Sequence, residues 1–310
     1  MGSLDGRVAI ITGAGRGIGR EHALFFAAEG AKVVVNDLGG DIHGEGADRA
    51  PAQQVVDEIK AAGGEAVANT DSVTDFEGAK RLIDLAVETF GDLHILVNNA
   101  GILRDRVLVN MTEEEWDAVI AVHLKGHFCP TRHAAAYWRE QSKAGKEVNA
   151  SIIHTSSTSG VLGNAGQTNY GAAKAGIAAF STICAMELGR YGVRSNAITP
   201  MARTRLTEQT PGLEDIVKKP DDPSVFDAWD PANISPVIAY LATPECPFTG
   251  EVFFVQGDTV CRYQPYTIAE RITNNGARWT VERLIEEGPK LSPAGERRGG
   301  PGELARATGT

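Results

Sequence analysis

A tyrosine and a lysine four residues apart form the most informative pattern in this sequence. Tyr170 and Lys174 belong to Asn169-Tyr-Gly-Ala-Ala-Lys174, and Ser157 precedes the tyrosine by thirteen residues. In a helix this spacing puts the phenol and the ammonium on one face. A free phenol has a pKa of about 10, and a nearby ammonium lowers it, which suits proton transfer to or from an alcohol or carbonyl oxygen. Ser157 would hold that oxygen. Alone, the spacing is equally that of an amphipathic helix, so other features must agree with it.

A glycine-rich loop follows the first predicted strand. The apolar run Val8-Ala-Ile-Ile11 is typical of a strand buried on both faces of a parallel sheet, and Thr12-Gly-Ala-Gly-Arg-Gly-Ile-Gly19 follows directly. Glycines at 13, 17 and 19 permit a tight turn and close approach of the backbone to a pyrophosphate at a helix N-terminus. The strand at 32–36 ends in Asp37, about 20 residues past the loop, where an acid accepts from a ribose 2′-hydroxyl.

A further predicted strand ends in two asparagines. The run Leu93-His-Ile-Leu-Val-Asn-Asn-Ala-Gly101 places side-chain amides where they would tie neighbouring strand ends together, and Gly101 leaves room for a flat ring. The plain alternative is an ordinary strand followed by a turn.

The order of elements predicts the fold. Strands are predicted near residues 7–12, 32–36, 65–70, 93–98, 151–155, 194–199 and 251–255, separated by helices at about 17–29, 51–62, 75–90, 112–138, 168–191 and 233–243. Thr112-Glu-Glu-Glu115 is a capping box before Trp116. This alternation predicts an α/β chain with one doubly wound, seven-stranded parallel sheet of the Rossmann type. Ligands bind at the carboxyl ends of such strands, and the motifs converge there.

These residues carry a resemblance. Through Thr12-Gly-x-x-x-Gly-x-Gly19, Asn98-Asn-Ala-Gly101, Ser157 and Tyr170-x-x-x-Lys174, residues 4 to about 260 resemble the short-chain dehydrogenase/reductase family. Within it the chain is most similar to the (3R)-hydroxyacyl-CoA dehydrogenases, which include part of the peroxisomal multifunctional enzyme type 2 and its bacterial relatives. The segments that carry this closer likeness are 33–41, 68–73, 100–106, 122–126 and 163–170.

The resemblance implies a hydride passing between a substrate carbon and a nicotinamide. It makes Tyr170 the acid/base, gives Lys174 the tuning of the tyrosine and the holding of the ribose, and lets Ser157 orient the substrate oxygen. It places the following residues against the cofactor: Gly13, Arg16, Gly17, Ile18, Gly19, Asp37, Asp71, Ser72, Asn98, Ala100, Gly101, Tyr170, Lys174, Pro200 and Thr204. For Asp71-Ser72, an N-cap of the helix at 75–90 is an alternative that does not exclude this role.

One position departs from the family. Where the family usually carries an asparagine that supports a water relay to the lysine, this chain has His123, as the closer subfamily does. We expect His123 to support catalysis, and the alternative is a packed histidine on a subunit-facing helix. His123 and His127 also form an i, i+4 pair, but no His-Glu-x-x-His glutamate accompanies them, and hydride transfer needs no metal, so we predict none.

Two charges give opposite indications of the cofactor. Asp37 favours NAD, because it would repel a 2′-phosphate. Arg16 is the kind of charge that NADP-using relatives employ. Because Asp37 would touch the discriminating group directly, we predict NAD.

Composition limits the remaining classes. A net charge of −10 and a pI of 5.3 argue against nucleic-acid binding. The four cysteines show no metal or redox spacing, which favours a reducing compartment. No apolar run approaches the ~18 residues of a membrane span. With the first strand opening at Val8 and no peroxisomal address at the end, we expect a cytoplasmic protein.

Less regular segments complete the chain. We predict one domain at 1–261, an extension with a helix at 262–287, and a disordered tail at 288–310. The loop 39–46 borders either the adenosine or solvent, and 205–232 corresponds to the family's lid over the substrate. The extension either encloses the substrate, in its own subunit or a neighbour, or packs on the outer surface.

The function implied is an NAD-dependent oxidation of a small-molecule secondary alcohol, first of all a 3-hydroxyacyl-CoA. A steroid or another small alcohol, and a non-catalytic NAD-sensing protein, are the alternatives. Apolar residues on the helices at 112–138 and 168–191 predict a homodimer or homotetramer; they are Val119, Val122, Phe128, Ile177, Phe180 and Ile183.

Overall fold

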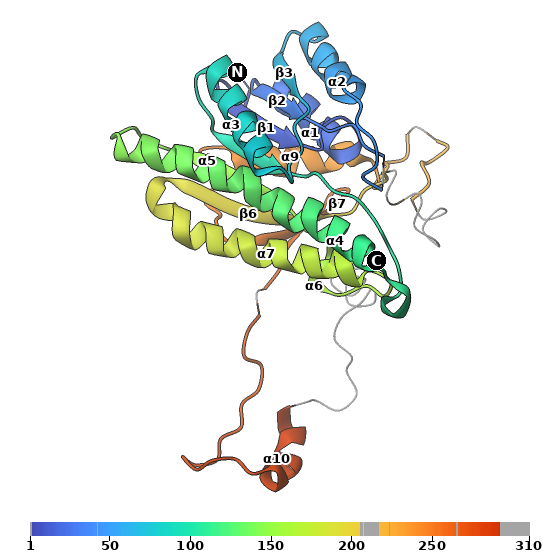
Figure 1. The fold of residues 1–310 in the computed structure, drawn as a ribbon, viewed down its shortest axis with the longest axis vertical. Coiled ribbons are helices and arrows are strands. Elements are labelled where there is room, and N and C mark those ends of the chain that lie inside the picture. The colour runs from blue at the N-terminus through green and yellow to red at the C-terminus, as the bar shows by residue number, and fades with distance from the viewer. Residues whose placement is uncertain are drawn as a thin grey trace.

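The computed structural model describes residues 2–41, 43–204, 207, 217–222, 224–264 and 266–291. Within these residues the centre is an eight-stranded sheet of order β3-β2-β1-β4-β5-β6-β7-β8 (Figure 1). Its strands are β1 (Val8–Thr12), β2 (Lys32–Asn36), β3 (Glu65–Asn69), β4 (Ile95–Asn98), β5 (Ala150–Thr155), β6 (Val193–Pro200), β7 (Val252–Gln256) and β8 (Thr259–Arg262). The predicted doubly wound parallel sheet is confirmed for β1 to β7.

The eighth strand was not predicted. β8 pairs antiparallel with β7 across the turn at Gly257-Asp258, where Gln256 faces Thr259 and Gly257 has a φ of 53°. A glycine followed by an aspartate is a hairpin signal. However, β8 is short and lies at the edge of the sheet, where two of its four residues are exposed. Its sequence therefore does not show the continuous apolar run by which the other strands were predicted.

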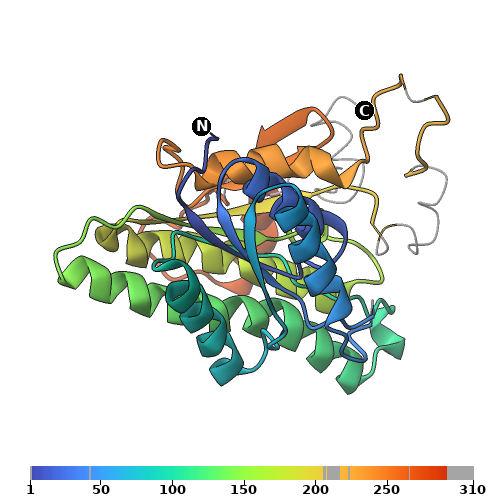
Figure 2. The ribbon, with the colours of Figure 1, turned by 90° about the horizontal axis from the view of Figure 1, so that it is seen from above.

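Helices cover both faces of the sheet (Figures 1 and 2). The helices are α1 (Gly17–Ala28), α2 (Ala50–Ala61), α3 (Phe76–Phe90), α4 (Glu113–Ile120), α5 (Gly126–Lys143), α6 (Thr158–Val161), α7 (Thr168–Leu188), α9 (Ser235–Ala242) and α10 (Val281–Glu287). Short 3-10 turns lie at Leu108–Asn110, Gly189–Tyr191, Pro231–Ile234 and Gly288–Leu291. α1 packs on α2 and α9 on one side of the sheet, whereas α3 packs on α5 on the other. In the described part of the chain, no helix combines the length and apolar character that crossing a membrane requires.

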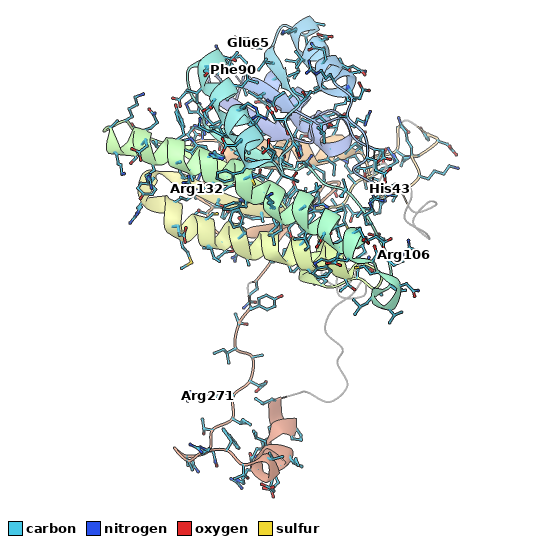
Figure 3. The ribbon with its side chains drawn as sticks, in the orientation of Figure 1. His43, Glu65, Phe90, Arg106, Arg132 and Arg271 are labelled. Atoms are coloured by element: carbon cyan, nitrogen blue, oxygen red, sulfur yellow. The ribbon has the colours of Figure 1, made fainter. Side chains whose placement is uncertain are left out.

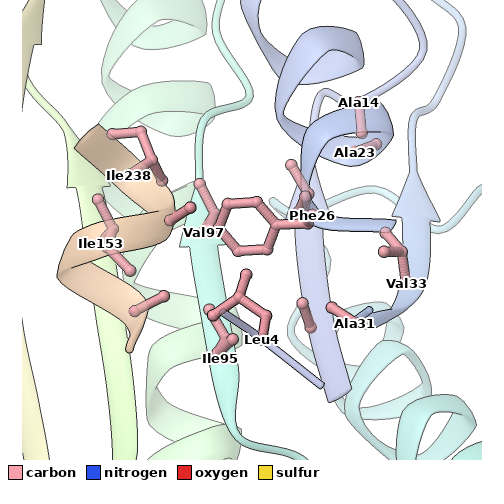
Figure 4. Close-up of a cluster of buried hydrophobic side chains, with 14 of the residues drawn as sticks. Leu4, Ala14, Ala23, Phe26, Ala31, Val33, Ile95, Val97, Ile153 and Ile238 are labelled. Carbon is pink, nitrogen blue, oxygen red and sulfur yellow. The ribbon is translucent and has the colours of Figure 1, made fainter. Parts of the chain in front are cut away.

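Alternating side chains of the strands fill two cores. In β1, Ala9 and Ile11 belong to the cluster that contains Phe26 of α1 (Figure 4). Val8 and Ile10 belong to the opposite cluster, with Trp138 of α5. Burial on both faces explains why the sequence of this strand reads as one continuous apolar run.

The predicted helix at 112–138 is broken in the structure. It begins as predicted, because Thr112 Oγ1 accepts from the Glu115 amide at 3.2 Å while the Glu115 carboxylate accepts from the Thr112 amide at 3.0 Å. α4 then ends in a π-helical turn, Ala121–Lys125, before α5 continues to Lys143. π turns often lie at functional sites, and this one contains His123. The helical periodicity of the sequence gave no sign of it.

The C-terminal extension leaves the body of the molecule after β8. Tyr263 remains attached, because its hydroxyl lies 3.0 Å from Thr199 Oγ1 and its amide donates to the Val252 carbonyl. The following segment is extended, with Tyr266 99% exposed, and carries α10 away from the sheet (Figure 1). Arg271 marks this segment among the side chains of Figure 3. Most of the tail predicted to be disordered lies outside the described residues.

Candidate active site

The glycine-rich loop comes into direct contact with the end of β4. Gly13 has a φ of 64°, and a Cβ atom on it would lie 2.8 Å from the Cα of Ala100, so only glycine fits there. Thr12 Oγ1 fixes the contact by accepting from the amides of Asn99 at 2.9 Å and Ala100 at 3.1 Å. The loops after β1 and β4 thus meet where the strand order reverses, the position at which doubly wound sheets bind ligands.

A single pocket at this edge collects most of the predicted site residues. Of the predicted set, the following line it: Gly13, Arg16, Gly17, Ile18, Gly19, Asp37, Asp71, Ser72, Ala100, Gly101, His123, Tyr170, Lys174, Pro200 and Thr204. Ser157 and Asn98 are not among the residues that line it. Part of the segment predicted to form a lid, including 205–206 and 208–216, lies outside the described residues.

Asp37 and Arg16 lie on the same stretch of the pocket wall. The Asp37 carboxylate accepts from the Gly15 amide at 2.8 Å and from the Gly39 amide at 2.7 Å. Arg16 Nη1 donates to the Gly40 carbonyl at 3.2 Å, so its guanidinium is held against the loop after β2. Both charges therefore line the pocket wall that forms where the glycine-rich loop meets the loop after β2.

The N-cap alternative for Asp71 and Ser72 is wrong. α3 is capped by Asp75, whose carboxylate accepts from the amides of Glu77 and Gly78. Asp71 instead accepts from Asn69 Nδ2 at 2.9 Å and forms an ion pair with Arg81. Its backbone carbonyl accepts from Asn36 Nδ2 at 2.9 Å, so the ends of β2 and β3 are joined beside the pocket.

Asn98 has a structural position. Its side chain is fully buried, and Nδ2 lies 3.0 Å from Thr131 Oγ1 of α5 and 3.3 Å from His154 Nδ1 of β5. The predicted tie between strand ends therefore exists, but its direction is away from the pocket. The neighbouring Asn99 lines the pocket and donates through Nδ2 to the carbonyls of Thr12 and Gly13. Sequence reasoning passed over Asn99, although alternation of side chains along the strand would have distinguished it from Asn98.

Ser157 contacts Tyr170, which lines the pocket. The Ser157 side chain forms a hydrogen bond with Tyr170 and is also the N-cap of α6, where it accepts from the Ser159 amide at 3.2 Å. Burial raises the pKa of Tyr170 to about 12; the bond from Ser157 acts in the opposite direction, and the charge of Asp105 adds to the rise. The phenol is therefore protonated at neutral pH in this structure, contrary to the lowered pKa that the spacing suggested.

Lys174 is buried beside the tyrosine. Its side chain is 2% exposed, and Nζ donates to the Thr155 carbonyl at 2.6 Å. Nζ lies 5.4 Å from the centre of the Tyr170 ring, as one helical turn requires. Burial lowers the pKa of Lys174 to about 7, so the lysine is charged in only part of the molecules at neutral pH.

His123 packs between the segment Gly101-Ile102 and the ring of Tyr170. Its Nε2 lies 2.7 Å from the Ile102 carbonyl and 3.2 Å from the Ile102 amide, and its ring meets Tyr170 edge-on at 5.0 Å. A Cβ atom on Gly101 would lie 2.5 Å from the imidazole, so the ring fills the space that the glycine leaves. Burial, then the charge of Lys174, lower the pKa of His123 well below 6.5, which keeps the ring neutral.

Comparisons with known proteins agree with this arrangement. Residues 7–212 match the family model described as short chain dehydrogenase. The chain is 44% identical to the hydroxyacyl-CoA dehydrogenase ChsB1 of Mycobacterium tuberculosis over 288 residues, which cover 91% of this chain and 87% of that protein. It is 50% identical to the peroxisomal multifunctional enzyme type 2 of Drosophila melanogaster over 246 residues, or 79% of this chain. The match spans only 38% of that longer enzyme.

A solved structure extends the likeness to three dimensions. The crystal structure of a short chain dehydrogenase from Mycobacterium avium superposes with a TM-score of 0.83 at 50% identity, covering 96% of this chain and 100% of that chain. The family model matches well over half of the present chain, and the pocket contains its motifs in contact with one another. This chain is a member of the short-chain dehydrogenase family, and so an NAD(P)-dependent oxidoreductase.

Proposed function

We propose that the protein is an NAD-dependent dehydrogenase that interconverts a 3-hydroxyacyl-CoA and its 3-oxo form. The observation that carries the chemistry is that Tyr170 and Lys174 line the dinucleotide pocket, with Lys174 Nζ 5.4 Å from the centre of the phenol ring and the Ser157 hydroxyl bonded to the phenol. The substrate class is supported by the likeness to a hydroxyacyl-CoA dehydrogenase over 91% of this chain.

The residues present fit a nicotinamide dinucleotide. Gly13 has no side chain, so only backbone lies at the turn. Gly15 precedes α1 and Gly17 begins it, and the N-terminus of this helix suits a pyrophosphate. When bound, the cofactor supplies the carbon that accepts or returns the hydride. Thr204, whose methyl lies 3.7 Å from where a Cβ of Gly17 would be, borders the same part of the pocket.

The protein's own groups handle the proton. In oxidation the substrate hydroxyl gives its proton to the Tyr170 phenolate while the carbon loses a hydride, and the C–O bond becomes a carbonyl. Ser157 donates to that oxygen and keeps it beside the phenol. The Lys174 ammonium stabilises the phenolate by its charge. In reduction the protonated phenol, which is the form present at neutral pH, gives its proton to the carbonyl oxygen.

Preference for NAD rests on Asp37. Its carboxylate lies on the pocket wall between the Gly15 and Gly39 amides, where a 2′-phosphate would meet a negative charge. Arg16 is bonded to the Gly40 carbonyl on the same wall and is the group that would favour NADP.

A substrate screen tests the proposal. The purified protein would be assayed with NAD against 3-hydroxyacyl-CoA thioesters of increasing length, and in parallel against steroid alcohols. We expect kcat/KM for some thioester to exceed that for every steroid by at least about tenfold. Turnover confined to steroids would overturn the substrate class but not the oxidoreductase. NAD binding without turnover of either set would favour the sensing protein.

We also propose that the protein is a homo-oligomer and that it is cytoplasmic. Of the residues predicted to form the interface, Val119 and Ile177 are buried within the subunit, whereas Phe128 is 44% and Ile183 is 52% exposed. Met186 of α7 adds to this apolar surface with 80% exposure. Light scattering would show a dimer or tetramer, and a monomer at micromolar concentration would contradict the assembly. The proposed cytoplasmic location rests on the free cysteines, which suit a reducing compartment. Imaging of a fluorescently tagged protein in cells would test it.

A further inference from the structure

A carboxylate that the proposed chemistry does not use, Asp105, lies in the loop after β4. Its Oδ2 accepts from Gln167 Nε2 at 2.7 Å, and this bond is partly buried although the aspartate as a whole is exposed. Gln167 is 8% exposed and is the N-cap residue of α7, three residues before Tyr170. The carboxylate therefore lies beside the first turn of the helix that carries the phenol.

The backbone on both sides of this carboxylate is fixed to the same turn. The Arg104 carbonyl accepts from Asn169 Nδ2 at 3.0 Å, and the Arg106 amide donates to the Gly166 carbonyl at 2.8 Å. Asn169 is fully buried and directly precedes the tyrosine in α7. Because both flanking residues are bonded, the aspartate cannot turn away from the helix unless these bonds break.

Hydrogen bonds continue from Gln167 to the serine that orients the substrate oxygen in the proposed function. Gln167 Oε1 accepts from Ser159 Oγ at 2.7 Å, and the Ser159 amide donates to Ser157 Oγ at 3.2 Å. Ser157 in turn bonds to Tyr170. Neither Ser157 nor Asp105 is among the described residues that line the dinucleotide pocket. The carboxylate therefore lies on the Ser157 side of the phenol, where the proposed function places the substrate.

The arginines on either side of Asp105 are paired with other carboxylates. Arg104 Nη2 lies 3.0 Å from Glu45 Oε1, and Arg106 Nη2 lies 2.8 Å from Glu115 Oε1. No cation among the described residues contributes to the pKa of Asp105, which burial raises against the bond from its glutamine partner. Asp105 thus presents a negative charge that no ion pair offsets in the described part of the chain.

This charge acts at the phenol. After burial, the charge of Asp105 is a further cause of the raised pKa of Tyr170. The other titratable groups beside the phenol are His123, which burial keeps neutral, and Lys174, which carries the opposite charge when it is protonated. A second negative charge brought next to Tyr170 would meet the Asp105 carboxylate in a partly buried space, where water screens charges less than in bulk.

We propose that Asp105 determines substrate specificity: its carboxylate repels alcohols that carry a negative charge two carbons from the reacting carbon, and so favours a neutral 3-hydroxyacyl thioester over the free 3-hydroxy acid. The thioester has no charge at C1, whereas the free acid is ionised there at neutral pH. The inference rests on the proposed function, because that function places C3 of the substrate at Tyr170.

Two substrates of equal acyl length test the proposal. They are racemic 3-hydroxybutyrate and its N-acetylcysteamine thioester, which lacks the phosphates of CoA. The quantity measured with NAD is the ratio of kcat/KM for the acid to kcat/KM for the thioester. We expect Asp105→Asn to raise this ratio about fivefold, because the amide keeps an oxygen for Gln167 Nε2 while the charge is lost. A general loss of activity, or a changed pKa of Tyr170, affects both substrates and cancels in the ratio.

Three further variants separate charge from structure. Asp105→Ser, a second neutral variant, should raise the ratio as Asp105→Asn does, whereas Asp105→Glu keeps the charge and should keep the ratio of the wild type. Asp57→Asn is the matched control, because Asp57 Oδ1 also accepts from a glutamine, Gln53 Nε2 at 2.8 Å, but this pair lies on α2. It should leave the ratio unchanged. Thermal unfolding and the NAD dissociation constant would show that each variant is folded.

The outcomes distinguish this inference from the proposed function. If the wild type turns over the thioester, an unchanged ratio in both neutral variants would overturn the inference alone, as would acid turnover that stays below detection in both. An equal rise in Asp57→Asn, or in Asp105→Glu, would also overturn it, because the charge at residue 105 would not be the cause. If the wild type turns over neither substrate, the proposed function fails and the inference fails with it.

Discussion

Lys174 Nζ lies 5.4 Å from the centre of the Tyr170 ring, and the same burial acts on the two groups in opposite ways. It raises the pKa of the phenol to about 12 and lowers that of the ammonium to about 7. Burial disfavours the charged form of each group, so in the free protein the phenol stays protonated and the lysine loses its proton more readily than in water.

The first prediction concerns the acid/base. Tyr170→Phe should reduce kcat by about 10²- to 10⁴-fold while the dissociation constant for NAD stays nearly unchanged, because only the proton-carrying hydroxyl is removed. Tyr137→Phe is the matched control, since that hydroxyl bonds to Asp92 at 2.8 Å outside the pocket and should not affect turnover. Retention of more than a small part of the activity by Tyr170→Phe would show that another group moves the proton.

The second prediction concerns pH. Reduction uses the protonated phenol, so its kcat/KM should change little between about pH 6 and about pH 9. Oxidation needs the phenolate, whose fraction rises with pH toward a pKa of about 12, so its kcat/KM should rise over the same range. A fall in oxidation above about pH 7 would mean instead that loss of the Lys174 charge dominates. Initial rates in both directions distinguish these outcomes.

The third prediction concerns the cofactor. The wild type should prefer NAD over NADP by at least about tenfold in kcat/KM, a difference of ~1.4 kcal/mol. Asp37→Ala should narrow this gap, because the charge that meets a 2′-phosphate is lost. Arg16→Ala is the companion variant and should widen it. Equal kcat/KM for both cofactors in the wild type would contradict the prediction and show that the charge of Arg16 offsets that of Asp37.

The fourth prediction concerns His123. His123→Asn should stay active, because it restores the asparagine that the family usually carries at this position. His123→Ala should lose about tenfold in kcat/KM, since the Ile102 groups are left unpaired beside Tyr170. Thermal unfolding would be measured alongside the kinetics. If the alanine variant only unfolds earlier and keeps its rates, the residue is a packing residue.

The fifth prediction concerns the C-terminal extension. None of the described residues beyond Arg262 lines the pocket of its own subunit, so truncation after Arg262 should leave the NAD dissociation constant unchanged. A change in the KM for a bulky CoA thioester would then show whether the extension reaches the pocket of a neighbouring subunit. If KM rises while NAD binding holds, the extension encloses the pocket of another subunit. If only the unfolding temperature falls, the extension is a structural strap.

Much of the fold follows from local patterns in the sequence. Val8 to Ile11 had to form a strand buried on both faces, because a continuous apolar run needs cover on both sides. Gly13 had to remain glycine, because both its φ of 64° and the 2.8 Å approach to Ala100 exclude a side chain. The four-residue spacing of Tyr170 and Lys174 fixed their common face once a helix formed there.

Only the tertiary structure decided what surrounds those residues. The sequence did not reveal the π-helical turn that brings His123 onto Ile102, because over a turn of five residues the apolar patterns of an α-helix and a π-helix are too similar to distinguish. Nor did it show that Asn98 faces α5 while Asn99 faces the pocket. The pKa of Tyr170 was misjudged for the same reason. Spacing along a helix tells how near a charge lies, whereas burial, which here outweighs that charge, depends on the packing of elements distant in the chain.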